Sequence, residues 1–314
     1  MNRLMGIVMV LGVLWVTGST TAIYRQFDDF QDEPIGPLNG QDAWYSQGGD
    51  NRIVEDPADP LNQVLYVPSE SSIIRKSLPV EHTGIPDGTA RMLFLRFRIS
   101  QKQTFAVGLS GLRYPSEFSD FAPEIGLANS AKNLDLRVWD DEEGNFEFVQ
   151  TLVPDRWYNL WVRVDALLNS YEVWLNDIPG ADASEADKLA AGDGDDVFDF
   201  RSGTNSDLLT FFIKTAGGNS GPNFGPVYFD DIYLELSGDL NLRNPIVLEE
   251  PIPGDADRDG GVNLIDLGIV AGSWFLGPEP AVSWEAGNFD FNDTVDITDL
   301  LLLAENWLSI RTGE

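Results

Sequence analysis

Short runs in which apolar and polar residues alternate fill the chain from about residue 24 to residue 236. Clusters of glycine, proline, asparagine and aspartate separate the runs, and no long amphipathic helical pattern interrupts them. Alternation with a period of two indicates strands buried on one face, and closely spaced turn residues are typical of an all-β sandwich. The pattern predicts strands at residues 93–99, 105–109, 134–139, 146–152, 158–164, 171–175, 208–214 and 227–236, and a loop with at most one helical turn at 181–191.

One face of these predicted strands supplies the hydrophobic core. The alternation assigns to it Leu93, Leu95, Phe97, Ile99, Leu134, Leu136, Val138, Leu160, Val162, Val164, Val173 and Leu175. The opposite face carries arginine and tryptophan beside Asp135, Asn159, Glu172 and Asn176. If the strands share one sheet, that face gathers cations and flat rings, which are groups that bind sugars by stacking and bidentate hydrogen bonds. We therefore predict a groove for a glycan, such as an acidic polysaccharide, lined by Arg96, Arg98, Arg137, Trp139, Trp161, Arg163 and Trp174.

The same face has a purely structural interpretation. The arginines could pair with Asp135 and Glu172 while the tryptophan rings pack beneath loops. An enzyme is a further alternative, because a glycoside hydrolase uses two facing carboxylates, and Asp135 with Glu172 is the candidate catalytic pair. The run Glu124-Ile125-Gly126 is the nearest approach to a strand bearing catalytic acids, but it has no partner acid at the alternate positions.

A duplicated acidic pattern occupies residues 254–310, after a proline-containing linker at 238–253. Residues 255–266 and 288–299 both place acidic or amide side chains at positions 1, 3, 5, 9 and 12, and the backbone carbonyl of Gly261 can complete the first set. An apolar run that predicts a helix follows each loop. Aligned, the repeats match at Gly254/Gly287, Asp257/Asp290, Val262/Val295, Asp266/Asp299, Leu267/Leu300, Ala271/Ala304 and Trp274/Trp307. Calcium takes six to eight oxygen ligands, which this spacing can wrap around the ion.

We therefore predict two Ca²⁺ sites in this module. Their ligands are Asp255, Asp257, Asp259, Gly261, Asn263 and Asp266 in the first loop, and Asn288, Asp290, Asn292, Thr294, Asp296 and Asp299 in the second. Asp293 replaces the turn glycine of the first loop, so the second site should bind more weakly. Trp274 and Trp307 should close a shared core, the alternative being a surface that binds a partner.

The repeats resemble a type I dockerin, which carries aspartate at the twelfth loop position as Asp266 and Asp299 do here. That resemblance implies a module that docks onto a cohesin-like or other protein partner, and an association with polysaccharide breakdown. The usual basic pair of the recognition positions is missing: Leu264-Ile265 and Ile297-Thr298 stand there.

Composition narrows the function further. With 51 acidic and 20 basic residues the formal net charge is −31, which argues against nucleic acid and anionic membranes as partners. The chain has no cysteine, which excludes thiolate sites, and its one histidine, His82, argues against a histidine-dependent catalytic triad. Residues 1–22 combine a short basic start, an apolar run and a small-residue end, which is typical of a secretory signal peptide, or alternatively of a membrane anchor. We therefore expect a secreted or cell-surface protein.

Residues 23–237 resemble the concanavalin A-like lectin and glucanase superfamily, especially laminin G-like jelly rolls. The resemblance rests on Phe27-Asp28-Asp29-Phe30, on a tryptophan-rich hairpin at 156–176 and on the closing run from Tyr228 to Leu234. It implies a lectin-like jelly roll with its first and last strands close together. Asp28, Asp29, Asp230 and Asp231 could then hold one structural calcium, or could simply provide polarity at turns and edge strands. A non-catalytic structural protein of the cell surface remains a further alternative.

Overall fold

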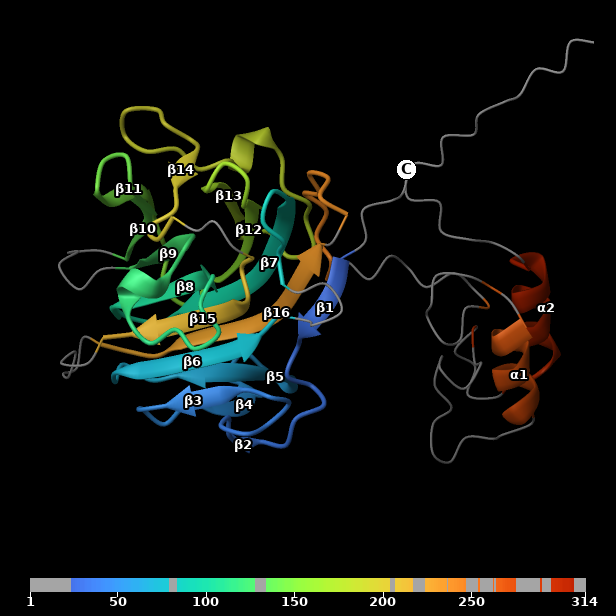
Figure 1. Ribbon diagram of the computed structural model, residues 1–314. Coiled ribbons are helices and arrows are strands. Elements are labelled where there is room, and N and C mark those ends of the chain that lie inside the picture. Colours follow the sequence, from blue (N-terminus) through green and yellow to red (C-terminus); the bar gives the residue numbers. More distant parts are fainter. Residues whose placement is uncertain are drawn as a thin grey trace, which may run out of the picture. The chain divides into compact units, whose positions relative to one another are not determined.

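The computed structural model describes residues 24–78, 84–127, 134–203, 207–216, 224–235, 237–246, 254, 262, 264–274, 289 and 295–307. The chain divides into two compact units (Figure 1). The first comprises Met1–Pro179 with Ala183–Leu242, and the second comprises Gly180–Asp182 with Arg243–Glu314. The signal-peptide prediction lies outside the described residues.

The first unit is a sandwich of two antiparallel sheets, as expected. The nine-stranded sheet has the order β14 (Phe198–Asp199), β13 (Ser170–Asn176), β12 (Trp157–Asp165), β7 (Ala90–Ile99), β16 (Val227–Glu235), β5 (Asp59–Val67), β4 (Arg52–Asp56) and β2 (Gly36–Pro37), with β1 (Tyr24–Asp28) paired to β16. The seven-stranded sheet has the order β11 (Asn145–Thr151), β10 (Asp135–Asp140), β9 (Glu124–Leu127), β8 (Phe105–Ser110), β15 (Thr210–Thr215), β6 (Ser72–Ser77) and β3 (Tyr45–Gln47).

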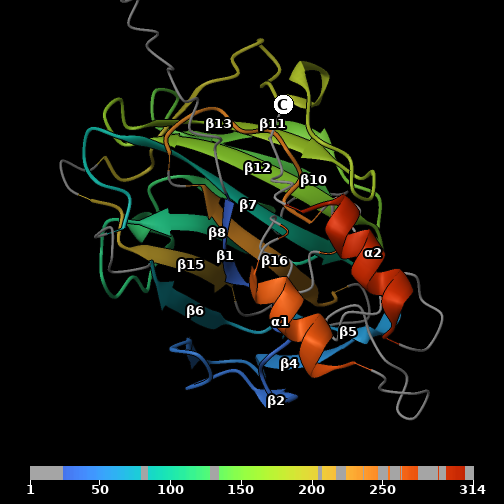
Figure 2. The ribbon, with the colours of Figure 1, turned by 90° about the vertical axis from the view of Figure 1, so that its right-hand side faces the viewer.

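The path of the chain is that of a jelly roll, because the chain crosses repeatedly from one sheet to the other. The strands β5 and β7 belong to the nine-stranded sheet, whereas β6 and β8 belong to the seven-stranded one. The first strand lies beside the last, with Tyr24 opposite Glu235 (Figures 1 and 2). Both features agree with the predicted sandwich and with the expected proximity of the two ends of the domain.

The core forms between the inward faces of the two sheets, and every predicted core residue is buried there. All eight predicted strands are present, with their ends within three residues of the expected ones. The predicted loop at 181–191 contains one short 3-10 helix, η3 (Glu185–Asp187). Strands β1 to β6, β9 and β14 were not predicted, because they are short or because prolines, glycines and charged residues interrupt their alternation.

The second unit contains two helices, α1 (Leu264–Gly272) and α2 (Ile297–Glu305), which follow the two predicted loops. A small core of Val262, Val270, Phe289, Val295 and Leu303 joins the repeats. Trp274 packs partly buried against this core, whereas Trp307 is 38% exposed, so only the first tryptophan closes the core as expected. In the part of the chain that the structure covers, no helix is long and apolar enough to span a bilayer.

Candidate functional site

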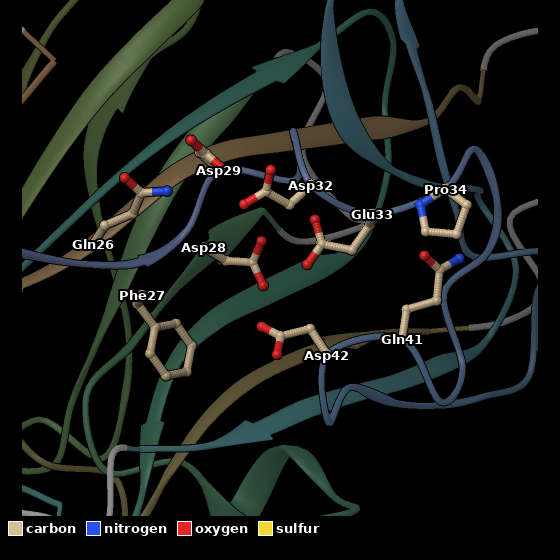
Figure 3. A pocket seen from close by; sticks show the side chains of 9 residues that line it. All are labelled: Gln26, Phe27, Asp28, Asp29, Asp32, Glu33, Pro34, Gln41 and Asp42. Carbon is tan, nitrogen blue, oxygen red and sulfur yellow. The ribbon is translucent and has the colours of Figure 1, made fainter. Parts of the chain in front are cut away.

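An acidic pocket of about 580 Å³ opens at the start of the sandwich (Figure 3). Carboxylate oxygens of Asp28, Glu33 and Asp42 point toward one another there and lie within 4.8 Å of each other. Asp28 is buried at the end of β1, whereas Asp42 is exposed in a turn with a positive φ of 34°. The backbone thus folds back on itself to bring together three carboxylates from one short segment.

Lys76 supplies an internal cation to this pocket. Its ammonium lies 2.6 Å from Asp28 Oδ2 and 2.5 Å from Asp42 Oδ2. Asp28 is also engaged by Trp44 Nε1 at 2.5 Å and by the Phe30 amide at 2.9 Å, so both of its oxygens already accept hydrogen bonds. Burial, and next the nearby charge of Asp28, raise the pKa of Glu33. Three carboxylates against one ammonium leave excess negative charge, and Glu33 and Asp42 are the groups best placed to ligate a divalent cation.

The four aspartates predicted to share a calcium ion do not gather into one site. Asp28 belongs to the acidic pocket, while Asp230 and Asp231 lie in a bulge of β16. Asp230 accepts a hydrogen bond from Asn62, and Asp231 pairs with Arg96 at 2.9 Å. Burial, together with the neighbouring carboxylate of Asp231, raises the pKa of Asp230 well above its ordinary range. These two carboxylates therefore have protein partners already: Asn62 donates a hydrogen bond to Asp230, and Arg96 forms an ion pair with Asp231.

The predicted glycan groove is split between the two sheets, which corrects the assumption that its strands share one. Arg137 and Trp139 lie on β10 of the seven-stranded sheet. The other five residues lie on strands of the nine-stranded sheet, namely Arg96, Arg98, Trp161, Arg163 and Trp174. The two groups therefore cannot line a single groove.

The two tryptophans of the nine-stranded sheet are also buried, which agrees with the structural interpretation and not with the predicted groove. Trp161 is 0% exposed and Trp174 is 1% exposed. Trp161 packs edge-to-face on Phe94 with ring centroids 5.0 Å apart, and Phe94 in turn contacts Tyr233. This second aromatic layer, outside the main core, leaves neither Trp161 nor Trp174 a free ring surface for stacking on a sugar.

The arginines of this sheet are held in ion pairs, but only Arg163 has a partner that the structural interpretation named, which is Glu172. Arg98 pairs with Asp56 at 2.9 Å, and both side chains are buried. Arg163 pairs with Glu172 at 2.7 Å, and Lys188 approaches the same carboxylate at 2.6 Å. Burial acts to raise the pKa of Glu172, but the hydrogen bonds from Lys188 and Arg163 lower it below its ordinary value.

The candidate catalytic pair is separated in the same way. Asp135 lies on β10 and accepts a hydrogen bond from Thr151, whereas Glu172 lies on β13 of the other sheet. Two carboxylates on different sheets cannot flank one glycosidic bond.

A different carboxylate forms the most unusual polar site of the sandwich. Glu124, on β9, is 0% exposed and pairs with Arg201 at 2.6 Å. Its second oxygen, Oε1, is buried and accepts no hydrogen bond from any described residue. Burial raises the pKa of Glu124 to about 7, even though the hydrogen bond and charge of Arg201 act to lower it. A buried acceptor without a donor costs free energy, so a hydroxyl group or a water molecule that donates to Oε1 would stabilise this site.

This carboxylate lines a cavity of about 230 Å³ on the outer face of the seven-stranded sheet. Its other lining residues are Thr104, Phe105, Phe118, Leu127, Phe146 and Arg201. The Arg201 guanidinium lies over the Trp139 ring, 4.1 Å from its centroid, and Trp139 packs edge-to-face on Phe146 at 5.1 Å. Trp139 Nε1 is buried as well and donates to no residue that the structure describes. An unmatched acceptor and an unmatched donor therefore lie among aromatic rings.

Of the predicted glycan-binding residues, only Trp139 belongs to the surroundings of this cavity. Glu124 itself was noted in the sequence only as part of the nearest approach to a strand bearing catalytic acids. Arg201 gave no signal, because it follows Glu124 by 77 positions and lies outside every predicted strand.

Most of the predicted calcium ligands in the C-terminal unit lie outside the described residues, namely Asp255, Asp257, Asp259, Gly261, Asn263, Asn288, Asp290, Asn292 and Thr294. Asp266 and Asp299 are described, and both are fully buried at equivalent positions of the repeats. Asp299 accepts hydrogen bonds from the amides of Phe289 and Asp296, at 2.6 Å and 2.9 Å, and Asp296 caps α2. Asp299 thus ties its loop to the helix, and the calcium assignment stays a prediction.

Comparison with known proteins finds only distant structural similarity. No protein-family model and no curated protein sequence matches the chain. Lectin II from Ulex europaeus is similar in structure, with a TM-score of 0.43 and 11% identity, over 68% of this chain and 97% of the lectin. A GH131 β-glucanase catalytic domain from Podospora anserina has a TM-score of 0.42 and 14% identity, over 68% of this chain and 88% of that domain. The Ca²⁺- and mannose-bound exoplasmic domain of VIP36 has a TM-score of 0.39 and 12% identity, over 65% and 87%.

Proposed function

We propose that the sandwich is the carbohydrate-binding domain of a secreted protein and that the Glu124–Arg201 cavity is its sugar site. The observation that supports this role is the buried Oε1 of Glu124, which no described residue partners. Arg201 pairs with this carboxylate and lies over the ring of Trp139, whose Nε1 is likewise without a described partner. A hydroxyl group both donates and accepts, so sugar hydroxyls can satisfy both atoms. Phe118 and Phe146 supply apolar surface for a sugar ring, and the polar groups of Glu124 and Arg201, which also line the cavity, fix its orientation.

Binding fits this cavity better than hydrolysis does. Glycoside hydrolases of the two common mechanisms place two carboxyl groups on either side of the scissile bond. Among the described residues that line the cavity, Glu124 is the sole carboxylate, and Arg201 already pairs with it. The distant similarities to lectins and a glucanase add no weight to either choice, so the role rests on the cavity itself.

The test is a glycan array probed with the full chain at pH 8, where Glu124 is a carboxylate, followed by calorimetry on the glycans that bind. We expect Glu124→Gln to lower the affinity, because the buried acceptor becomes an amide of different hydrogen-bonding character. Glu143→Gln, in the exposed hairpin between β10 and β11, is the matched control and should bind normally. Absence of binding to every glycan, or equal binding by Glu124→Gln, would disprove the proposal.

The acidic pocket is proposed as a second, structural site for calcium. Its support is the excess negative charge of Asp28, Glu33 and Asp42 over Lys76, on carboxylate oxygens that lie within 4.8 Å of one another. A bound divalent cation would stabilise the folded chain and raise its melting temperature. Glu33→Gln should reduce the part of that increase that comes from this pocket, whereas Asp50→Asn, an exposed aspartate outside the pocket, should leave it intact.

The C-terminal unit is proposed to be a dockerin-like calcium module that docks the sandwich onto another protein. In this proposal the signal peptide ends at residue 22, the sandwich at residue 237 and the linker at residue 253. The shared core of the repeats and the helix after each loop support the proposal that this unit is a separate, duplicated module. Removal of calcium with a chelator should make residues 254–310 of the full chain sensitive to limited proteolysis. A cleavage pattern that is identical with and without chelator would argue against calcium-dependent folding.

A further inference from the structure

Arg137 lies beside the Glu124 cavity, on the outer face of the seven-stranded sheet. Its neighbours along β10, Leu136 and Val138, belong to the core, so the Arg137 side chain is on the opposite face. On the adjacent strand, β9, Arg137 lies opposite Gly126, which stands between two residues that line the cavity (Figure 1). The guanidinium is therefore carried by a position just outside the cavity.

The Arg137 side chain has no partner in the part of the chain that the structure describes. Its Nε is buried and takes part in no hydrogen bond there, and none of the described carboxylates forms an ion pair with it. Asp135, the next residue on this face of β10, instead accepts a hydrogen bond from Thr151. A buried donor without an acceptor costs free energy, and the cost is larger for a charged group than for a neutral one.

Arg137 differs in this respect from other arginines on the strands of the sandwich. Four of them each form an ion pair with a carboxylate, namely Arg52, Arg96, Arg98 and Arg163. Two more donate to backbone carbonyl oxygens, namely Arg75 and Arg91. In a chain with 51 acidic and 20 basic residues, carboxylates far outnumber cations. A strand guanidinium that lacks both kinds of partner is therefore suited to an anion from outside the fold.

The face around Arg137 is open toward the edge of the sheet. The segment that covers the middle of this face lies over β8 and β15, where Phe121 stacks on Phe212 with ring centroids 4.4 Å apart. Strand β9 separates that covered part from β10, which carries Arg137. On the other side of Arg137, the residue opposite it on the edge strand β11 is Phe148, which is 46% exposed. A ligand that reaches the cavity from this edge passes a guanidinium and an exposed ring.

We infer that the sugar bound at the Glu124 cavity is acidic and that Arg137 pairs with its anionic group. This inference rests on the proposed sugar site. A guanidinium binds a carboxylate, such as that of a uronic acid, through two parallel hydrogen bonds. The cavity's own carboxylate, Glu124, is matched by Arg201 at 2.6 Å and leaves Arg137 to the ligand. The net charge of the chain does not prevent this contact, because at about 0.1 M salt exposed charges more than about 10 Å away are largely screened.

The experiment is calorimetry on the full chain at pH 8 with pairs of oligosaccharides of equal length. Oligogalacturonate is compared with the matching galacto-oligosaccharide, and glucuronic and mannuronic acid oligomers with their neutral counterparts. A sulfated galacto-oligosaccharide distinguishes sulfate from carboxylate. In the series that binds, the acidic member should bind roughly ten-fold or more tightly than the neutral one, on the usual energy of hydrogen bonds to charged groups. Arg137→Gln should remove this advantage, so that both members bind alike.

The control is Arg52→Gln, which makes the same change in net charge on the nine-stranded sheet and should keep the preference of the wild type. Neutral members that bind as tightly as acidic ones, or an Arg137→Gln variant that keeps the preference, would overturn the acidic ligand and leave the sugar site intact. An Arg137→Gln variant that weakens acidic and neutral members equally would also overturn it, because Arg137 would then act through the fold. Absence of binding in every series would overturn the proposed function and this inference together.

Discussion

Glu124 makes the stability of the sandwich depend on pH, and one substitution isolates the effect. Its carboxyl group is fully buried, and its pKa is raised from 4.5 to about 7 by that burial. A carboxyl with a higher pKa in the folded chain binds its proton more tightly there than in the unfolded chain. Its contribution to stability is therefore complete below pH 4.5 and is lost as the pH rises through 7.

The size of this loss follows from the two pKa values. At about 1.4 kcal/mol per pKa unit, a rise from 4.5 to about 7 corresponds to about 3 kcal/mol of unfolding free energy lost between pH 4 and pH 8. Glu124→Gln has no proton to lose at this position. The free energy of unfolding of the variant, relative to the wild type, should therefore increase by about 3 kcal/mol over that interval.

Urea denaturation of both proteins, followed by tryptophan fluorescence at several pH values from 4 to 8, measures this difference. The other carboxyl groups titrate in both proteins and largely cancel in the comparison. Glu143→Gln, which changes an exposed glutamate, should show no such trend. A difference between wild type and Glu124→Gln that stays constant with pH, or that changes in the opposite direction, would refute the assignment of Glu124 as a buried group titrating near pH 7.

Two further substitutions test the packing around the sites. Lys76→Met should destabilise the fold by about 3–5 kcal/mol in chemical denaturation, because it leaves the buried carboxylate of Asp28 without its ammonium. A loss below about 1 kcal/mol would mean that the remaining hydrogen bonds to Asp28 suffice. Gly108→Ala should lower the melting temperature markedly, because its Cβ would lie 2.0 Å from a backbone oxygen of Pro123. Gly192→Ala, where nothing lies within 4 Å of the added Cβ, is the control, and equal melting temperatures for the two variants would contradict this packing.

The sequence predicted strands well where alternation was long and unbroken. Residues 93–99 form most of β7, because Leu93, Leu95 and Phe97 all face the core. It did not predict which strands share a sheet, since pairing depends on contacts between distant parts of the chain. Arg137 and Trp139 were consequently placed with strands that belong to the other sheet.

Period-two alternation also says nothing about a second buried layer. The ring of Trp161 points away from the main core as predicted, yet Phe94 packs against it and it is buried. The sequence did not predict the Glu124 cavity for a related reason. It needs Arg201 from a loop and Phe146 from a neighbouring strand, and only the folded chain brings these residues together.

The central position of β16 has a consequence for how the sandwich forms. This last strand lies between β7 and β5, so without it the nine-stranded sheet is two separate ribbons. It also holds β1, whose first residue, Tyr24, pairs with Glu235 near the other end of the domain. Contacts so far apart in sequence are slow to form and leave strand edges unpaired meanwhile. The sheet is therefore completed only after synthesis has passed residue 235, and a chain that stops earlier is left with open edges that invite aggregation.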